Sequence, residues 1–276
     1  MTGLVLRLRA EPALRLDLSP LTPELLAGQS ADAIARTPLS YGRRSVPAGE
    51  WFDVRGTAGS DLLIEGDGTR LDRIGADMQN GAIRVEGSAG AYLGIGMRGG
   101  RIEVSGSVDA YAGCGLVGGL VRIAGDAGDF AGAALPGEHR GMRGGVLIVA
   151  GRLGDRAGDH MRRGLILAEG GCGDYCGARM MGGTIATLGP CGSRPGFAMQ
   201  RGTLLLAGPG PSPGPTFNDA GELAYGFLVL LARSWKELPS RFASLSRSSI
   251  RGRRWIGDLA FGGQGELIHW PDQPTA

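Results

Sequence analysis

Residues 97–119 read MRGGRIEVSGSVDAYAGCGLVGG, and this stretch carries the pattern from which the fold is predicted. Short segments with apolar residues at alternate positions, such as Ile102-Glu103-Val104, are typical of β-strands, and glycines separate them. Glycine has no Cβ atom and adopts a positive φ without steric cost, so it is suited to sharp corners. The stretch therefore predicts short strands joined at glycine corners.

The glycine corners recur with a period of 19 residues. Their positions are Gly81, Gly100, Gly119, Gly145, Gly164, Gly183 and Gly202. The one longer interval exceeds the period by seven residues, near the turn-rich segment 135–141. Six of the eight methionines share one column of the repeat, at positions 78, 97, 142, 161, 180 and 199, and we interpret this column as core packing rather than a copper-binding stripe. A repeat this regular indicates units that stack with equivalent side chains above one another.

Nineteen residues are too few for a helix-turn-helix unit but suit two or three short strands. Parallel stacking of such units, with the usual crossover hand, predicts an all-β fold built around a right-handed parallel β-helix. We expect a small N-terminal cap at residues 1–60, the repeats at 61–208, and a Pro/Gly linker with a C-terminal docking extension at 209–276. Thr22 and Pro23 predict a helix start in the cap. The apolar segment 221–238 predicts a helix that covers the far end or docks on another chain.

Composition limits the function classes. The formal net charge of +2 calls for no polyanionic partner, and a hydrophobic content of 42% supports a real core. The N-terminus lacks the pattern of a signal peptide, and the longest apolar run is too short to span a bilayer. We therefore expect a cytoplasmic protein that binds neither nucleic acid nor membrane.

Two columns of the repeat contain residues that can carry chemistry. Cys172 and Cys191 fall in one column, with Cys176 nearby, and either form a thiolate metal site or fill space in the core. Three aspartates share a second column, at positions 129, 155 and 174. Stacked carboxylates repel one another, so this column either binds a cation, forms an active site or is an exposed corner beside arginines.

No catalytic grouping of nucleophile, base and acid is visible in the sequence. The three histidines, His139, His160 and His269, are scattered, and His139 lies in the insertion. The glycine-rich segments do not lead from a strand into a long helix, so they are not phosphate-binding loops. The sequence thus predicts an architecture without a catalytic centre, which favours a scaffold or interaction subunit.

The densest basic cluster follows the apolar segment near the C-terminus. It contains Arg247, Arg251, Arg253, Arg254 and Trp255, to which we assign partner binding. Arginine forks bind carboxylates well, so an acidic partner surface or a polyglutamate chain fits this cluster. Nucleic acid fits less well because the overall charge is almost balanced, and a solvated face without a partner is the remaining alternative.

The repeat from Met78 to Gly208 resembles the C subunit of the formylmethanofuran dehydrogenase family. Flanking segments strengthen the resemblance: residues 30–35 (SADAIA), 51–54 (WFDV), 254–260 (RWIGDLA) and 262–267 (GGQGEL). Similar glycine repeats occur in the C-terminal domain of the large glutamate synthase chain, and the flanks distinguish the two families.

The resemblance implies a non-catalytic β-helical subunit of a multi-subunit enzyme. One form of that enzyme is the molybdenum or tungsten dehydrogenase of methanogenic archaea. The other is the formyltransferase/hydrolase complex of methylotrophic bacteria, which passes a formyl group from tetrahydromethanopterin to a methanofuran-like carrier and releases formate. The high arginine content favours the bacterial form.

The resemblance also implies which partners and cofactors to expect. The sister subunits would be an amidohydrolase-like subunit, a formyltransferase subunit and a dehydrogenase-like B subunit. The metal and the methanofuran-type carrier would bind to those partners, with no metal, cofactor or catalytic residue in this chain. Two alternatives remain: a stand-alone enzyme acting on polysaccharide or acyl groups, and a glutamate-synthase-like module.

Overall fold

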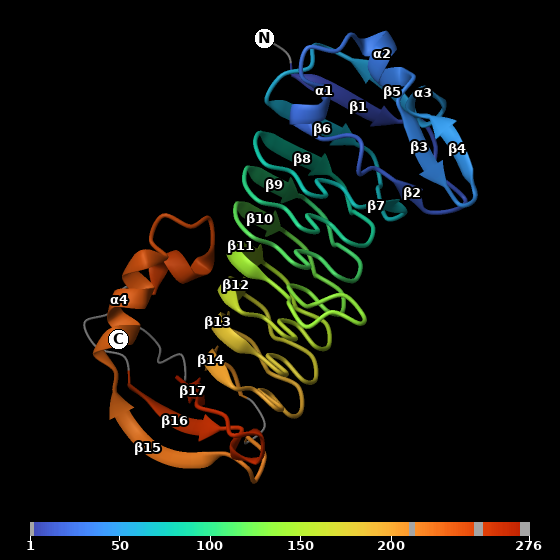
Figure 1. Ribbon diagram of the computed structural model, residues 1–276. Coiled ribbons are helices and arrows are strands. Elements are labelled where there is room, and N and C mark those ends of the chain that lie inside the picture. The colour runs from blue at the N-terminus through green and yellow to red at the C-terminus, as the bar shows by residue number, and fades with distance from the viewer. Residues whose placement is uncertain (1–2, 210–212, 246–250, 271–276) are drawn as a thin grey trace.

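The computed structural model describes residues 3–209, 213–245 and 251–270 of the 276-residue chain. Figure 1 shows a long stack of repeats with the N-terminal elements packed at one end and the C-terminal elements at the other. Each repeat supplies one strand to a large sheet, so position along the chain maps onto position along the stack.

The strands fall into three groups along the chain. The N-terminal group comprises β1 (Leu4–Leu8), β2 (Leu16–Asp17), β3 (Pro38–Tyr41), β4 (Arg44–Pro47) and β5 (Phe52–Arg55). The repeats supply β6 (Asp61–Glu65), β7 (Leu71–Asp72), β8 (Ala82–Glu86), β9 (Arg101–Val104), β10 (Leu120–Ile123), β11 (Arg143–Val149), β12 (Arg163–Ala168), β13 (Met181–Thr187) and β14 (Arg201–Leu206). The C-terminal group comprises β15 (Asn218–Ala224), β16 (Arg251–Gly257) and β17 (Gly265–His269).

Helices are few and short, and they lie at the two ends of the chain. The N-terminal helices are α1 (Pro23–Leu26), α2 (Ala31–Ala35) and α3 (Ala48–Trp51). The C-terminal part contains α4 (Gly226–Ser234) and two short 3₁₀ helices, η1 (Arg241–Ser244) and η2 (Leu259–Phe261). No helix in the described ranges has the length and apolar character needed to cross a bilayer.

The prediction of a right-handed parallel β-helix is wrong. The structure instead contains one mixed sheet of 13 strands, in the order β15-β16-β17-β14-β13-β12-β11-β10-β9-β8-β6-β1-β5. Its middle strands are parallel, whereas β5 at one edge and β15 and β16 at the other are antiparallel to their neighbours. Beyond the sheet, successive repeats pair in isolated bridges such as Ala89↔Val108 and Val108↔Ala127, and further backbone hydrogen bonds join their turns, such as that from the Gly113 N–H to the Leu93 carbonyl.

The glycine corners explain why each repeat after the first forms one strand. Turns with positive φ occupy much of each repeat outside its strand, so no second run is long enough to form a ladder. A Cβ atom at Gly119 would lie 2.6 Å from the Cε atom of Met97, and one at Gly164 would lie 2.6 Å from that of Met142. The glycine column therefore leaves room for the methionine column of the preceding repeat.

The 19-residue register predicted by the repeat is present in the sheet. Ile83 pairs with Ile102, and Val121 pairs with the same residue from the other side. The six methionines of the repeat column are all fully buried in the main core. Stacked identical or similar side chains thus form the interior, which is the core interpretation of the methionine column.

The N-terminal elements extend the stack at its first repeat. Strand β1 pairs in parallel with β6 and antiparallel with β5, while β2 joins β7 in a second sheet with β3 and β4. Helix α1 begins at Pro23 with Thr22 in the N-cap position, as predicted, but the Thr22 side chain makes no capping hydrogen bond. The domain boundaries at residues 60 and 208 stay a prediction.

The C-terminal segment differs from the expected helix over 221–238. Its first part is strand β15, and the helix α4 begins only at Gly226. Strand β17 continues the parallel stack beside β14, so it covers the open end of the sheet, and β16 and β15 follow it. Helix α4 lies beside the stack, where Leu228, Ala232 and the following Trp235 pack on the outer face of the sheet.

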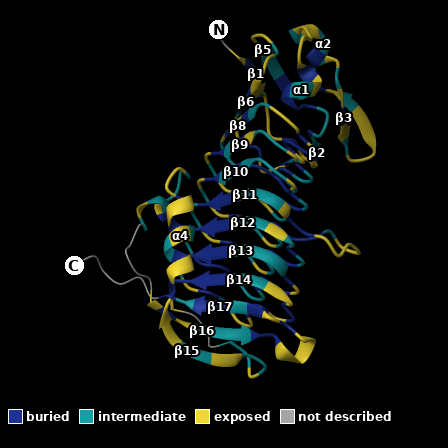
Figure 2. Cartoon of the chain, turned by 60° about the vertical axis from the view of Figure 1, so that its left-hand side comes forward, coloured by how far each residue is buried: buried dark blue, intermediate teal, exposed yellow. Residues whose placement is uncertain are grey.

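The outer face of the sheet changes character along the stack. One outward column begins with Leu63, Arg84, Glu103 and Arg122 on the first strands. The same column continues as Ile148, Leu167, Ala186, Leu205 and Ile268, which are all buried in a second core. Figure 2 shows the ends of strands β11 to β14 beside α4 as buried. The sequence therefore encodes a covered half and an open half of this face.

Candidate functional site: surfaces and buried polar clusters of the stack

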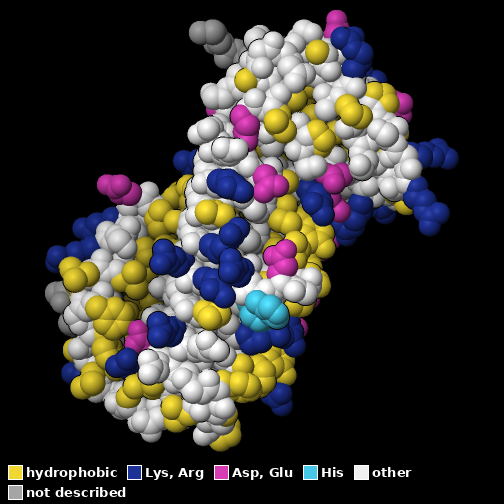
Figure 3. Space-filling model, viewed as in Figure 1, with side chains coloured by type: hydrophobic (Ala, Val, Ile, Leu, Met, Phe, Trp, Pro, Cys, Tyr) yellow, Lys and Arg dark blue, Asp and Glu magenta, His cyan; other side chains and the backbone are white. Residues whose placement is uncertain are grey.

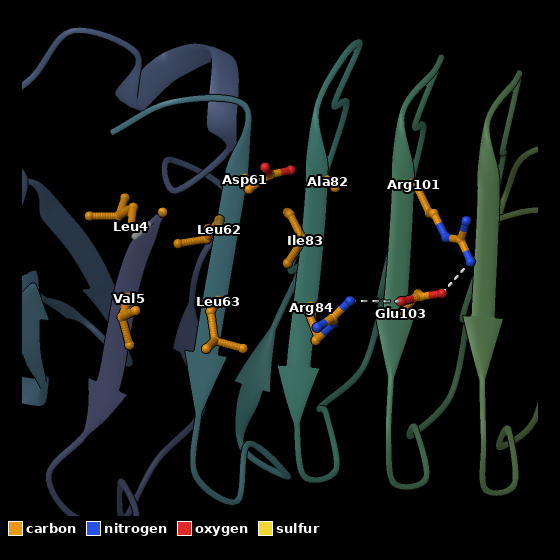
Figure 4. A pocket seen from close by; sticks show the side chains of 11 residues that line it. Leu4, Val5, Asp61, Leu62, Leu63, Ala82, Ile83, Arg84, Arg101 and Glu103 are labelled. Carbon is orange, nitrogen blue, oxygen red and sulfur yellow. Dashed lines mark hydrogen bonds and ion pairs between the residues drawn. The ribbon is translucent and has the colours of Figure 1, made fainter. Parts of the chain in front are cut away.

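The open half of the outer face is hollowed near the N-terminal end. A hollow of about 690 Å³ lies on β1, β6, β8 and β9. In Figure 4, Val5 and Leu63 form its apolar side, while Arg84 and Arg101 point toward Glu103. The Arg84 guanidinium lies 3.7 Å from the Glu103 carboxylate, and Arg101 also pairs with it. The hollow thus offers an apolar strip beside charges that are already paired, which suits a protein surface more than a small polar substrate.

A second hollow of about 400 Å³ is formed by the seven-residue insertion. Its lining includes Tyr111, Phe130, His139 and His160. The rings of Tyr111 and Phe130 stack with centroids 4.9 Å apart, and those of the two histidines lie 5.6 Å apart. Two histidines scattered in the sequence are therefore brought together by the fold, whereas His269 lies on β17.

Asp159 is the buried charge beneath this second hollow. It is 3% exposed and pairs with the Arg179 guanidinium, whose Nε lies 2.9 Å from Oδ1. Arg156 lies 3.7 Å from the same carboxylate, and the Nδ1 atom of His160 lies 3.1 Å from it. Burial lowers the pKa of His160 despite the neighbouring carboxylate, so the imidazole is neutral at pH 7. Because Arg156 and His160 of one repeat and Arg179 of the next surround the Asp159 carboxylate, this cluster fastens two repeats together.

The sequence analysis did not identify the Asp159 cluster. Its members lie on successive repeats, and Arg179 follows Asp159 by 20 residues rather than 19. The available signal was the stacking itself, which places residues one period apart side by side. An acidic residue followed 20 residues later, one position beyond the period, by an arginine is the pattern to look for.

The aspartate column has a structural role. The Oδ1 atom of Asp129 accepts a hydrogen bond from the backbone N–H of Asp155 at 2.8 Å. Asp155 accepts one from Asp174 at 2.8 Å, and Asp174 accepts one from Ser193 at 2.7 Å. Each carboxylate therefore binds the next repeat, and this charge-assisted bond offsets the repulsion between stacked aspartates.

The cysteine column lies inside the core. Cys172, Cys176 and Cys191 are all buried, and the Sγ atoms of Cys172 and Cys191 are 3.2 Å apart. Hydrogen bonding to Cys172, together with burial, raises the pKa of Cys176 and of Cys191, so these two thiols are protonated at neutral pH. Over the described ranges no group of three or more metal-binding side chains is arranged around a common point. The three thiols are packed inside the core and hydrogen-bond to one another.

The predicted partner-binding residues lie mostly on β16, at the C-terminal edge of the sheet. Arg251 and Arg253 are exposed, and Arg254 and Trp255 are half-buried; Arg247 lies outside the described residues. All three described arginines already face carboxylates of this chain. The Arg251 guanidinium lies 3.5 Å from the Glu222 carboxylate, and that of Arg254 lies 2.9 Å from the Glu266 carboxylate. The Arg253 guanidinium forms an ion pair with Asp219. Their role in partner binding stays a prediction.

The comparisons with known proteins agree with the repeat. The family model described as "GXGXG motif" matches residues 48–210, which is more than half of the chain. The Fhc C subunit of the formyltransferase/hydrolase complex of Methylorubrum extorquens is 43% identical over 88 residues, which cover 32% of this chain and 33% of that protein. The C subunit of molybdenum-containing formylmethanofuran dehydrogenase 1 from Methanosarcina barkeri is 38% identical over 85 residues, which cover 29% and 28%. These alignments therefore span about a third of the curated relatives.

A solved structure extends the similarity to almost the whole chain. The crystal structure of the formyltransferase/hydrolase complex from Methylorubrum extorquens, determined with methylofuran, contains a chain that is 41% identical. The match has a TM-score of 0.90 and covers 98% of this chain and 100% of that chain. The chain therefore belongs to the GXGXG-motif family, and its resemblance to the C subunits of the formylmethanofuran dehydrogenases and the formyltransferase/hydrolase complex is confirmed.

Proposed function

We propose that this chain is the C subunit, a non-catalytic structural component, of a formyltransferase/hydrolase complex. The observation that carries the proposal is the end-to-end structural match to a chain of that complex at 41% identity. The described residues support a structural role, because the carboxylates of the repeats are used to bind one repeat to the next. In this role the chain acts as a rigid flank on which catalytic subunits assemble.

The proposal includes a division of labour within the complex. The formyl group would pass from tetrahydromethanopterin to a methanofuran-type carrier and be released as formate on sister subunits. An amidohydrolase-like subunit, a formyltransferase subunit and a dehydrogenase-like B subunit are the partners, and the metal and carrier bind to them. The complex would act in the cytoplasm.

The exposed side of the C-terminal segment supports docking. Helix α4 buries Leu228 and Ala232 against the sheet, yet Phe227 and Leu230 on its other side are 42% and 65% exposed. Leu223 of β15 is also 55% exposed. Exposed large apolar side chains that gather on one segment mark protein interfaces. The extension thus fastens itself to the repeats with one face and offers the other to a sister subunit.

A second form of the complex is favoured by a specific observation. The C subunits of archaeal molybdenum and tungsten formylmethanofuran dehydrogenases match at 38% and 36% identity, close to the 43% of the bacterial relative. The dehydrogenase form would bring a molybdopterin-dependent subunit and iron–sulfur partners instead.

The test is to tag this chain in its native host, purify it gently and identify the associated proteins by mass spectrometry. Recovery of an amidohydrolase-like chain together with a formyltransferase chain is expected. A molybdopterin-dependent chain with iron–sulfur proteins would move the assignment to the dehydrogenase form. Recovery of the chain alone, under conditions that preserve a control complex, would contradict the structural-subunit role.

A further inference from the structure

Four arginines on neighbouring repeats line a groove that the preceding roles do not use. The groove has a volume of about 600 Å³, and its walls are Arg143, Arg162, Arg163, Met181, Gln200 and Arg201. Strands β11, β12, β13 and β14 begin at this groove, since Arg143, Arg163, Met181 and Arg201 are their first residues. Figure 3 shows basic side chains gathered over the middle of the stack on one face.

The charges of this groove are not neutralised by the part of the chain that the structure describes. None of the four arginines has a carboxylate of a described residue within ion-pair distance. The Nε atom of Arg162 is buried and has no hydrogen-bond partner among those residues. A buried donor without an acceptor is unfavourable, and stacked like charges add to that cost. Both costs are removed when a bound anion supplies the acceptors.

The glycines between the arginines keep the groove open. At the residue preceding the corner glycine, the four repeats carry Gly144, Arg163, Gly182 and Arg201. A Cβ atom at Gly144 would lie 2.1 Å from the Val117 carbonyl oxygen, and one at Gly182 would lie 2.5 Å from that of Arg162. Side chains are therefore excluded from this column at every second repeat. Glycines and arginines alternate along it, with Arg163 between Gly144 and Gly182, and Arg201 after Gly182.

The dimensions of the groove match an extended chain. Parallel strands lie about 4.8 Å apart, so the groove extends about 14 Å from β11 to β14. A fully extended peptide of four or five residues covers this length at about 3.3 Å per residue. A single inorganic anion fills only a small part of it. The arginines are therefore spaced for several acidic groups along one chain.

The lining chemistry selects the class of ligand. Arginine forks bind carboxylates in a bidentate manner, and the groove presents four of them. Nucleic-acid strands are usually held by aromatic side chains that stack on the bases, and no aromatic ring lines this groove. Met181 offers an apolar contact for the methylene groups of glutamate, and Gln200 offers an amide donor. The combination fits an acidic polypeptide.

We propose that this groove binds an extended acidic segment of a partner polypeptide; that the partner is a sister subunit rests on the proposed function. The arginines hold the carboxylates of the segment, and the Arg162 Nε–H finds its acceptor there. The groove is separate from the predicted arginine cluster on β16, whose described members already face carboxylates of this chain.

The experiment measures binding of a fluorescein-labelled hexaglutamate peptide to the full-length chain by fluorescence anisotropy at fixed ionic strength. Labelled hexaglutamine and hexathymidylate serve as comparison probes. The test variant is Arg163→Ser/Arg201→Ser. Its matched control is Arg84→Ser/Arg98→Ser, which removes the same charge, with Arg98 in the same repeat column as Arg143 and Arg162 but outside the groove. Circular dichroism confirms that both variants fold.

The proposal predicts that the chain binds hexaglutamate well and does not bind hexaglutamine. The test variant should weaken hexaglutamate binding about tenfold or more, as the loss of two charge-assisted contacts implies, while the control keeps most of the affinity. Equal binding of hexaglutamine, tighter binding of hexathymidylate, or equal losses in the two variants would each overturn the proposal. Because the assay uses this chain alone, its outcome is independent of which proteins co-purify with the chain.

Discussion

Two groups of arginines on this molecule have opposite surroundings. The group on β16 is dense in the sequence, yet Arg251, Arg253 and Arg254 each face a carboxylate of this chain. The group in the groove is spread over three repeats, and its arginines have no such partner among the described residues. The difference teaches that density of charge along a sequence and availability of charge on a surface are separate properties. Availability is decided by what the fold places opposite each charge.

The largest expected effect tests whether the C-terminal segment that carries β16 is anchored to the stack. Trp235 is 1% exposed and packs against Phe242 and Trp270, with ring centroids 5.4 and 6.4 Å away. Trp235→Ala should lower the free energy of unfolding by about 3–5 kcal/mol, as measured by urea denaturation. Trp235→Phe should lose much less. Hexaglutamate affinity should stay unchanged in both variants, because the groove is built by the repeats. If Trp235→Ala lowers the free energy of unfolding by less than about 1 kcal/mol, the extension is not anchored at Trp235.

A substitution at Gly144 tests whether close backbone packing shapes the groove. Gly144→Ala places a Cβ atom against the Val117 backbone, and such overpacking costs about 1–3 kcal/mol. The same change should weaken hexaglutamate binding because it displaces the neighbouring strand starts. Gly226→Ala is the control, since no atom lies within 4 Å of the added Cβ at that position. If the two variants unfold at the same denaturant concentration, the close approach at Gly144 is not a constraint.

Single arginine changes in the two groups should affect thermal stability differently. Arg253→Ser leaves Asp219 without its partner and should lower Tm slightly. Arg163→Ser removes one of several like charges and should leave Tm unchanged or raise it, most clearly at low salt, where screening is weak. Differential scanning calorimetry at two salt concentrations measures both. A fall in Tm for Arg163→Ser would indicate that its charge is already compensated, which contradicts the account of the groove.

The smallest effect concerns pH. The hydrogen bond from Arg253 lowers the pKa of Asp219 below its ordinary value. A carboxylate with a depressed pKa contributes stability above its unfolded pKa, and this contribution is lost as the pH falls through the folded pKa. The unmodified chain should therefore lose a little stability below about pH 4, and the Asp219→Asn variant should lack this loss. Thermal melts of the two proteins over this pH range measure the difference. Identical acid-side curves would mean that the Arg253 pair is not formed in solution.

The repeat made much of the stack predictable. The glycine period places Ile83, Ile102 and Val121 in register, and the methionine column is buried as the core interpretation requires. The number of sheets was not predictable from it. A period reports how often a corner recurs, but not whether the residues between corners pair as a ladder or meet in a single bridge, as Val108 does.

The sites were harder to predict than the stack. The β16 arginines were visible because they are adjacent in the sequence, but their partners Glu222 and Asp219 lie on a separate strand that was expected to be helical in part. The groove was missed because Arg143, Arg163 and Arg201 fall in columns where glycine and other residues also occur. Only the stacked structure shows that these arginines meet and that no described carboxylate joins them.

The most direct measurement is arginine footprinting with phenylglyoxal, read by mass spectrometry, on the isolated chain and on the chain in its native assembly. The account predicts that Arg143, Arg163 and Arg201 react readily in the isolated chain and are protected in the assembly. Protection confined to Arg251, Arg253 and Arg254, with the groove arginines equally reactive in both states, would contradict the account and place the partner on β16.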